Sequence, residues 1–160
     1  MEYLIDTSSL IDLERRYPEN VFKTLYNNID IEISNGRLRT IEQVLSELKK
    51  GGDKVYTRFK NKKDFFLKTS SEIMYKAYTI TANYPQIINN SRLNNTENDP
   101  ADPYLIATSI ILNNSMLQDN HIKIITEEDT KKNHIPDIAK KFNIECIRIL
   151  KFFQVNNWEF

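Results

Sequence analysis

Hydrophobic positions along this chain follow two patterns, short continuous apolar runs and longer segments with apolar residues at helical spacing. The run Tyr-Leu-Ile at residues 3–5 is typical of a short buried strand, and it stops at Asp6. Helical spacing begins at Leu10 and resumes after Pro18, a residue that suits the first turn of a helix. We therefore predict one strand followed by two short helices.

The next segments predict a second strand and more helix. Residues 31–39 contain Asn35-Gly36, which indicates a turn and a short strand. Residues 41–50 repeat apolar positions on one helical face, and the glycines at 51 and 52 predict the end of that helix. Residues 53–82 have the mixed polarity of a helical segment, with breaks near Asn61 and Ser70.

The second half of the chain continues the alternation. The polar, Asn-rich residues 83–99 predict a loop, because short polar side chains compete with regular backbone hydrogen bonds. A helix should then begin near Pro100 and Pro103. The remaining expected elements are a strand at residues 122–126, a short helix begun by Pro136 within residues 134–142, and a last strand at residues 145–149.

Strands that alternate with helical segments imply crossover connections and a mainly parallel sheet covered by helices on both faces. We expect a three-layer α/β/α sandwich. A length of 160 residues suits one domain, so we assign residues 1–160 to a single unit with a helical insert at about 53–82.

Composition narrows the class of protein only slightly. The 22 basic and 22 acidic side chains cancel, which argues against a uniformly basic nucleic-acid coat. Cys146 is the single cysteine, so it cannot form an internal disulfide and fits a small buried residue in a reducing compartment. No apolar run is long enough for a membrane span, and the first residues lack the pattern of a signal peptide, so we expect a soluble cytoplasmic protein without membrane contact.

Acidic residues recur at the ends of the predicted strands and at helix starts. Asp6 ends the first strand, and ligands of open α/β sheets lie at the carboxyl ends of strands. Taken alone, Asp6 with Thr7, Ser8 and Ser9 also fits a simple strand-to-helix cap. The other members of this set are Glu47, Asp102 and the acids Glu127, Glu128 and Asp129.

Each of these acids has a plain structural interpretation as well. Glu47 fits a solvated helix face, and Asp102 fits a helix N-terminus, where an acid is stabilised by the macrodipole. Three or four carboxylates in one cleft, however, repel one another unless a cation neutralises them. Oxygen-only ligands select Mg²⁺ or Mn²⁺ over zinc, and we interpret His121 and His134 as structural because neither has a partner at metal-ligand spacing.

Four motifs carry a resemblance to a known family. DTSSLIDL, EQVLSELKK, ADPYLIATSI and IITEED resemble, in order and spacing, the motifs of PIN-domain ribonucleases, including the VapC toxins of bacterial toxin–antitoxin pairs. The likeness spans nearly the whole chain and implies a PIN-like fold and a metal-dependent endoribonuclease that leaves a 5′-phosphate. It further implies Asp6, Glu47 and Asp102 as metal ligands, with Ser8 beside the first acid to orient a carboxylate or a phosphate oxygen.

The fourth motif departs from the family pattern, because Thr126-Glu127-Glu128 has a glutamate where many relatives have aspartate. We assign the fourth ligand to Glu128, with Glu127 as the alternative. The long segment 53–82 makes the chain a peripheral branch of such a family, so which RNA is cut does not carry over. The resemblance also implies an antitoxin protein as a partner and a possible homodimer.

A basic stretch follows Glu47 directly. Residues 49–68 hold eight basic residues against two acids, interleaved with aromatic residues that suit stacking on unpaired bases. We assign substrate binding to Lys49, Lys50, Lys54 and Arg58, together with Ser8. The alternative is a solvated helical face whose aromatics Tyr56, Phe59, Phe65 and Phe66 face the core.

Two other functions compete with the nuclease. Phosphoryl-transfer enzymes also place an aspartate after the first strand, but the phosphatase pattern needs a second aspartate where Ser8 stands. The other is a PIN-like module that binds RNA or protein and has lost catalysis. Mn²⁺ binding that disappears in Asp6→Asn would favour the enzyme.

Overall fold

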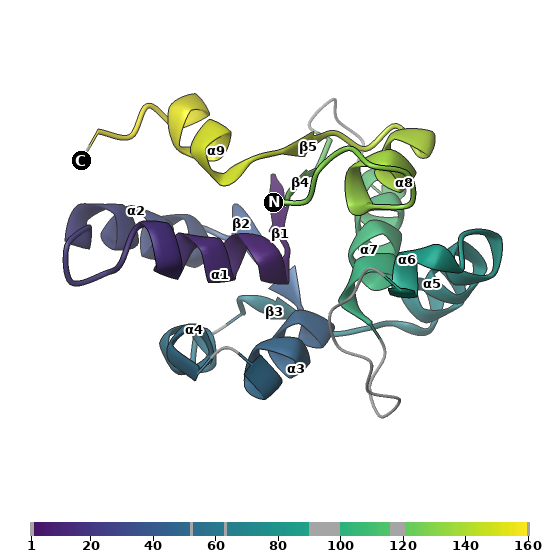
Figure 1. The fold of residues 1–160 in the computed structure, drawn as a ribbon, viewed down its shortest axis with the longest axis horizontal. Coiled ribbons are helices and arrows are strands. Elements are labelled where there is room, and N and C mark those ends of the chain that lie inside the picture. The colour runs from purple at the N-terminus through teal and green to yellow at the C-terminus, as the bar shows by residue number, and fades with distance from the viewer. Residues whose placement is uncertain (1, 52, 63, 90–99, 116–120, 160) are drawn as a thin grey trace.

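A computed structural model describes residues 2–51, 53–62, 64–89, 100–115 and 121–159 (Figure 1). Its strands form one parallel sheet with the order β3-β2-β1-β4-β5. The strands are β1 (Tyr3–Ile5), β2 (Leu38–Ile41), β3 (Phe66–Leu67), β4 (Lys123–Ile125) and β5 (Cys146–Ile147). The helices are α1 (Thr7–Arg16), α2 (Lys23–Ser34), α3 (Glu42–Gly51), α4 (Asp53–Phe59), α5 (Ser71–Asn83), α6 (Gln86–Asn89), α7 (Ala101–Ser115), α8 (Ile135–Lys141) and α9 (Ile149–Val155).

The sheet is the middle layer of a three-layer α/β/α sandwich, as the sequence predicts. Helices α1 and α2 lie on one side of it, and α5, α6, α7 and α8 lie on the other (Figure 1). The central strands are buried on both faces, so Leu4, Ile5, Ile124 and Ile125 form a continuous apolar layer. Strand order reverses between β1 and β4, and their carboxyl ends are therefore where a ligand of this fold is expected.

The turn at Asn35-Gly36 ends a helix and does not precede the second strand directly. Helix α2 continues to Ser34, with Gly36 at a φ of 69°, and the N–H groups of Gly36 and Arg37 donate to the carbonyls of Ile33 and Glu32. This is a glycine-terminated helix end, in which the left-handed residue lets the last carbonyls find donors. The predicted strand over residues 31–39 is therefore wrong at its start, and β2 begins at Leu38.

The predicted helical insert at 53–82 is only partly helical. Its breaks near Asn61 and Ser70 are confirmed, but the segment between them contains β3, which pairs with β2 at the edge of the sheet. The backbone N–H of Thr40 donates to the carbonyl of Phe65, whose ring is buried. Two residues of strand are too few to produce an alternating pattern, so the sequence shows no sign of β3.

Three further differences concern short elements. Helix α6 lies within the predicted loop 83–99, of which residues 90–99 are outside the described part of the chain. The last strand is shorter than predicted, because Ile149 begins α9, a helix that we did not predict. Cys146 on β5 is half-buried, and burial raises the pKa of its thiol to about 12, so it remains a neutral, free cysteine.

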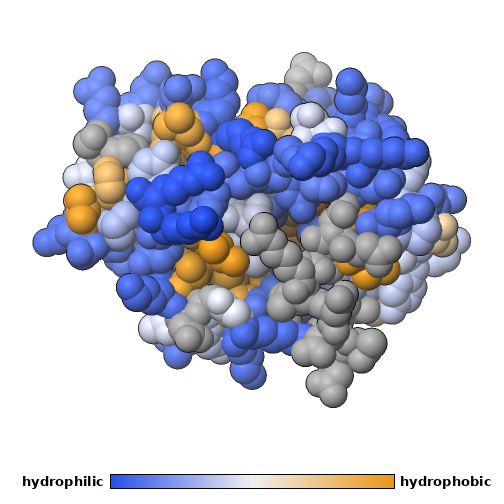
Figure 2. All heavy atoms as spheres, viewed as in Figure 1, coloured by the Kyte–Doolittle hydropathy of each residue, from blue (hydrophilic) through white to orange (hydrophobic). Residues whose placement is uncertain are grey.

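Surface character agrees with the balanced composition. Figure 2 shows hydrophilic side chains over most of the visible face, with apolar ones in separate patches. Within the described ranges, no helix has both the length and the apolar character needed to cross a bilayer.

Candidate functional site

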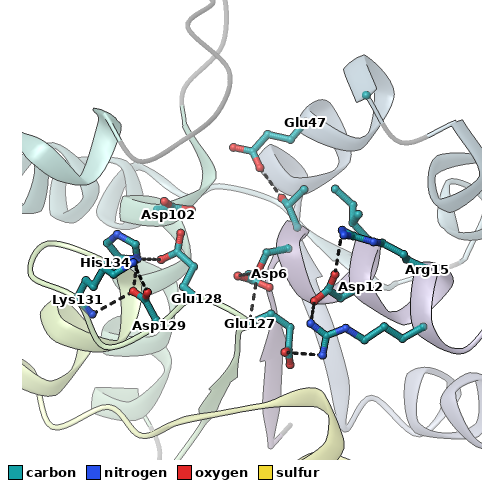
Figure 3. A pocket seen from close by; sticks show the side chains of 15 residues that line it. Asp6, Asp12, Arg15, Glu47, Asp102, Glu127, Glu128, Asp129, Lys131 and His134 are labelled. Carbon is teal, nitrogen blue, oxygen red and sulfur yellow. Dashed lines mark hydrogen bonds and ion pairs between the residues drawn. The ribbon is translucent and has the colours of Figure 1, made fainter.

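A pocket of about 700 Å³ opens at the carboxyl ends of β1 and β4. Its walls come from α1, α3, the start of α7 and the segment between β4 and α8 (Figure 3). The acids that line it are Asp6, Asp12, Glu47, Asp102, Glu127, Glu128 and Asp129, and the basic side chains are Arg15, Arg16, Lys131 and His134. The structure therefore brings all the predicted acidic ligands to one cavity.

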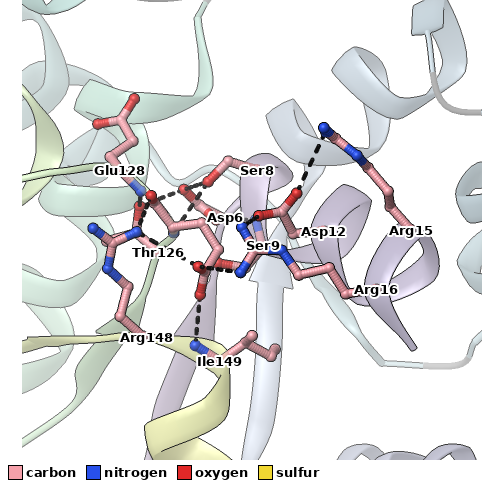
Figure 4. A network of polar contacts seen from close by, with 11 residues as sticks. Asp6, Ser8, Ser9, Asp12, Arg15, Arg16, Thr126, Glu128, Arg148 and Ile149 are labelled. Atoms are coloured by element: carbon pink, nitrogen blue, oxygen red, sulfur yellow. Dashed lines mark hydrogen bonds and ion pairs between the residues drawn. The ribbon is translucent and has the colours of Figure 1, made fainter.

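Asp6 is both a helix cap and the acid at the base of the pocket. One carboxylate oxygen accepts from the Ser9 N–H at 2.7 Å, and the other accepts from the hydroxyls of Ser8 and Thr126 at 2.7 and 2.6 Å (Figure 4). The side chain is buried, and burial raises the pKa of Asp6, while the hydrogen bonds from Thr126, Ser8 and Ser9 lower it in part. The cap and the pocket acid, two interpretations of the sequence, thus both hold.

Glu47 joins three helices. Its carboxylate accepts a hydrogen bond from the Thr7 hydroxyl at the start of α1, and another, 3.0 Å long, from the backbone N–H of Ala101 at the start of α7. Burial raises the pKa of Glu47, and the negative charge of Asp6 raises it further, whereas Lys50 lowers it. Glu47 is therefore fixed at the pocket wall.

Within the described part of the chain, Asp102 has the fewest hydrogen bonds of the four pocket acids. Among the described residues, its carboxylate accepts no hydrogen bond, and the pKa of Asp102 is raised well above its usual value. Burial is the largest cause, followed by the negative charges of Glu128, Glu47 and Asp6. A helix N-terminus alone does not offset this crowding, whereas binding of a proton or of an external cation would neutralise it.

Glu127 and Glu128 have different environments although they are adjacent. The Glu127 carboxylate accepts from the Ile149 N–H at 2.8 Å and faces Arg16 and Arg148, and Figure 3 shows it turned away from Glu128. Glu128 points toward Asp102 and accepts from the Ile135 N–H at 2.8 Å. Burial raises the pKa of Glu128, and the negative charge of Asp6 adds to this. The geometry thus favours Glu128 as the fourth pocket acid and makes Glu127 an anchor of α9.

The oxygen donors of the pocket suit a hard divalent cation by their type, but not by their present spacing. Asp6, Glu47, Asp102 and Glu128 offer only oxygen ligands, which suit Mg²⁺ or Mn²⁺. Nevertheless, no three His, Cys, Asp or Glu side chains in the described ranges are close enough to hold one metal ion as they stand. The carboxylates of Asp6 and Glu47 are instead held by hydrogen bonds to protein groups.

Comparison with known protein families gives one match over almost the entire chain. A family model described as a domain of unknown function, DUF4411, matches residues 3–160. The chain belongs to the DUF4411 family. No curated protein matches it. Because the family description gives no function, the chemistry of the pocket residues is what indicates one for this DUF4411 chain.

The predicted substrate-binding residues of the DUF4411 chain lie mostly outside the pocket. The Arg58 guanidinium lies 2.9 Å from Asp30 on α2 and 3.0 Å from Glu19, which precedes that helix. Lys49, Lys50 and Lys54 do not line the cavity, although Lys50 is close enough to Glu47 to lower its pKa. The structure thus does not bring Arg58 into the pocket, because α4 uses it to bind Asp30, and its assignment to substrate binding stays a prediction.

The aromatic residues of the same stretch belong to the core. Phe59 and Phe65 are buried, their rings 5.4 Å apart, and Tyr56 and Phe66 pack against that core. Phe59 and Phe65 are therefore not available for stacking on bases, whereas Tyr56 and Phe66 are only partly buried. The alternative interpretation of this stretch, aromatics turned toward the core, is confirmed for Phe59 and Phe65.

Several pocket residues were missed or misjudged from the sequence. His134 lines the pocket, with its Nδ1 atom 3.1 Å from Asp129 Oδ1, whereas His121 is exposed. Asp12 follows Ser8 by one helical turn, and Arg15 and Arg16 follow Asp12 by one more, so their spacing places them on the α1 face that borders the pocket. Lys131 carries no such pattern, because it lies in an irregular segment.

Thr126 connects the two central strand ends of the DUF4411 fold. Its buried hydroxyl donates to Asp6 and accepts from the Glu128 N–H at 3.1 Å. Thr126→Val keeps the shape but leaves the Glu128 N–H unpaired and removes one of the two hydroxyl donors to the same Asp6 oxygen, so we expect a loss of about 1–3 kcal/mol in the free energy of unfolding. Urea unfolding monitored by circular dichroism measures it, and Thr126→Ser, which retains the hydroxyl and lacks only the methyl group, is the control. A loss in Thr126→Ser as large as that in Thr126→Val would contradict a role for the hydroxyl.

Proposed function

We propose that this chain is a metal-dependent endoribonuclease, a hydrolase that cuts RNA phosphodiester bonds with Mg²⁺ or Mn²⁺ at Asp6, Glu47, Asp102 and Glu128. One observation carries the proposal: four carboxylates from separate parts of the chain line one pocket at the switch point of the sheet, and Asp102 has no hydrogen bond among the described residues to offset its charge. The motif resemblance to PIN-domain ribonucleases supports the same chemistry.

The reaction is hydrolysis, in which a water oxygen bonds to phosphorus and the bond to the 3′ oxygen breaks, leaving a 5′-phosphate and a 3′-hydroxyl. When bound, a divalent cation lowers the pKa of the attacking water and offsets charge on the phosphate oxygens. Asp6 and Asp102 would hold the cation, and Glu128 would complete the acidic set. Glu47 holds the start of α7 through the Ala101 N–H and thereby positions Asp102, the next residue.

Ser8 acts on Asp6 in this scheme. Its hydroxyl donates to Asp6 and its oxygen accepts from the Glu127 N–H at 3.2 Å, so both its donor and its acceptor form hydrogen bonds within the protein. Thr126 does the same from the β4 side. These two hydroxyls fix the rotamer of Asp6, which keeps a ligand rigid enough for catalysis.

The biological setting rests on the motif resemblance. We propose that the protein is the toxin of a bacterial toxin–antitoxin pair, acting on RNA in the cytoplasm and bound by an antitoxin protein, with a homodimer as a further possibility. The free Cys146 is compatible with a reducing compartment.

A second candidate is a catalytically inactive PIN-like module that binds RNA or protein. The observation in its favour is that the carboxylates of Asp6 and Glu47 already accept hydrogen bonds from protein groups, and that no three potential ligands of the described chain are at metal-binding distance. A module of this kind does not bind Mn²⁺ and does not cut RNA.

The adjacent glutamates provide the test. Purified protein is incubated with total bacterial RNA and Mn²⁺, and RNA ends are mapped; we expect new 5′-phosphate ends that EDTA abolishes. Glu128→Gln should slow cleavage by at least about 10- to 100-fold, the cost of losing even an outer partner of a metal ligand, because it removes charge facing Asp102. Glu127→Gln is the matched control, since it makes the same chemical change at the residue that anchors α9.

The outcomes separate the candidates. Cleavage that is lost in Glu128→Gln and kept in Glu127→Gln supports the nuclease. RNA that stays intact with wild-type protein, together with no heat of Mn²⁺ binding in calorimetry, would support the binding module.

A further inference from the structure

Basic side chains stand on two opposite walls of the acidic pocket. Arg15 lies on the last turn of α1, and Lys131 lies between β4 and α8. Figure 3 shows them on opposite sides of Asp6 and Glu128. Both line the same cavity as the four proposed ligands, so a chain that crosses the pocket meets a positive charge before and after the acids.

These two side chains are only weakly held by the protein. Arg15 is 74% exposed, and its guanidinium is 3.8 Å from Asp12; the Lys131 side chain is 76% exposed and makes its ion pair, at 2.8 Å, with the half-exposed Asp129. Exposed ion pairs of this kind contribute little to stability, so their cations can exchange a carboxylate for a phosphate. Arg16, in contrast, is held between Asp12 at 2.8 Å and Glu127.

Two basic residues near the end of α4 are held more firmly. The side chains of Arg58, on α4, and Lys62, after it, are only 17% and 28% exposed, and both bind Asp30 on α2. Their positive charges therefore join this part of the chain to α2. A polyanion near the pocket depends on Arg15 and Lys131 more than on these residues, because the pocket acids repel phosphate.

Pocket size and lining define the kind of polyanion. A cavity of about 700 Å³ is in the range of pockets that enclose small ligands, about 300–1,000 Å³, which suits an unpaired strand more than a duplex. The described lining contains no Phe, Tyr or Trp side chain; His134 is its aromatic member and Ile11 its apolar one. The His134 side chain is only 24% exposed and lies against Asp129, so contacts at the site of cleavage are mainly to phosphates and not to bases.

We propose that Arg15 and Lys131 bind the phosphates on the two sides of the bond that is cut, and so guide a single strand across the acids. This inference rests on the proposed function, since it places the strand over the proposed catalytic acids. It replaces Arg58 as the source of substrate affinity with residues on the pocket walls. Two phosphates bound in this way fix the direction of the strand between α1 and the β4–α8 segment.

Fluorescence anisotropy with a short labelled single-stranded RNA tests this proposal, in Ca²⁺ buffer and again in EDTA. We expect Arg15→Gln and Lys131→Gln each to weaken binding about fivefold at low salt and to reduce the slope of log affinity against log salt by about 0.7. Lys23→Gln is the matched control, because Lys23 is an exposed lysine on α2 outside the pocket and was not assigned to substrate binding. Thermal unfolding checks that all three variants fold.

Losses confined to Arg15→Gln and Lys131→Gln support the proposal. An equal loss in Lys23→Gln, or no RNA binding by wild-type protein, would overturn it. A single-stranded DNA of the same sequence should bind similarly, whereas a duplex that binds as tightly as the single strand would overturn the guided-strand arrangement.

Failure of this proposal can be told apart from failure of the proposed function. Mn²⁺ titration and RNA cleavage that are intact in wild type, with normal RNA binding by both pocket-wall variants, would leave the nuclease standing and remove the roles of Arg15 and Lys131. Weakened RNA binding by both variants, without Mn²⁺ binding or cleavage in wild type, would leave their roles standing and remove the nuclease.

Discussion

Replacing Asp102 with asparagine is expected to abolish RNA cleavage and, at the same time, to stabilise the metal-free protein. The catalytic loss should exceed about 100-fold, more than removal of an outer partner of a metal site costs. The stabilisation follows because burial and the charges of Glu128, Glu47 and Asp6 raise the pKa of Asp102, so its ionised form is unfavourable in the folded state. Asparagine removes that charge while it keeps the shape.

Cleavage assays with Mn²⁺ and thermal unfolding in EDTA measure the two effects. Each kcal/mol gained raises the melting temperature by about 2–4 °C in a chain of this size. Asp129→Asn is the matched control, because Asp129 is an exposed acid of the same pocket and its pKa is lowered by the hydrogen bond and charge of Lys131. Asp129→Asn should give no stabilisation. A metal-free Asp102→Asn protein that melts below wild type would contradict this account of Asp102.

The metal-free protein is expected to lose stability as the pH rises from weakly acidic to neutral, the reverse of ordinary acid denaturation. Burial raises the pKa values of Asp6, Glu47, Asp102 and Glu128 above their usual 3.8 for Asp and 4.5 for Glu. The folded state therefore keeps protons that the unfolded chain has released. Stability from these groups is complete below the unfolded values and is lost as the pH rises through the raised folded values.

The slope can reach about 1.4 kcal/mol per pH unit for each proton that distinguishes the two states. Urea unfolding between pH 5 and pH 8 in EDTA measures it. Mn²⁺ should cancel the decline, because a cation competes with protons for the same oxygens. At 100 times its dissociation constant the metal adds about 2.7 kcal/mol. Stability that is independent of pH and of Mn²⁺ would show that these acids do not form a coupled cation site.

The larger elements of the fold were predictable because their signals are local. The apolar run of β1, the start of α7 near Pro100 and Pro103, and the strand β4 each show in a few adjacent residues. Helix α9 and strand β3 were not predicted, since each depends on distant contacts. β3 is a strand because Phe65 packs in the core and its carbonyl accepts from Thr40, 25 positions earlier in the chain.

The acids of the site were predictable for a related reason. An acid directly after a buried strand, as at Asp6, and an acid two residues past Pro100, as at Asp102, mark places where a parallel sheet gathers side chains. A count of charges along residues 49–68 could not reveal the ion pair of Arg58, because its partner Asp30 lies on another helix, 28 positions away. Thr126 was visible as part of the strand motif, but its link to Asp6 spans 120 positions and appears only in the folded chain.

The double role of Asp6 has a consequence for genetics. Its carboxylate caps the N-terminus of α1 and also faces the cavity. An alanine allele removes both features together, so loss of function in that allele does not distinguish misfolding from loss of catalysis. Asparagine preserves the capping oxygen and discards the ionic charge, which makes it the informative allele in any screen. Saturation mutagenesis scored only by survival would merge misfolded alleles with inactive ones at this position.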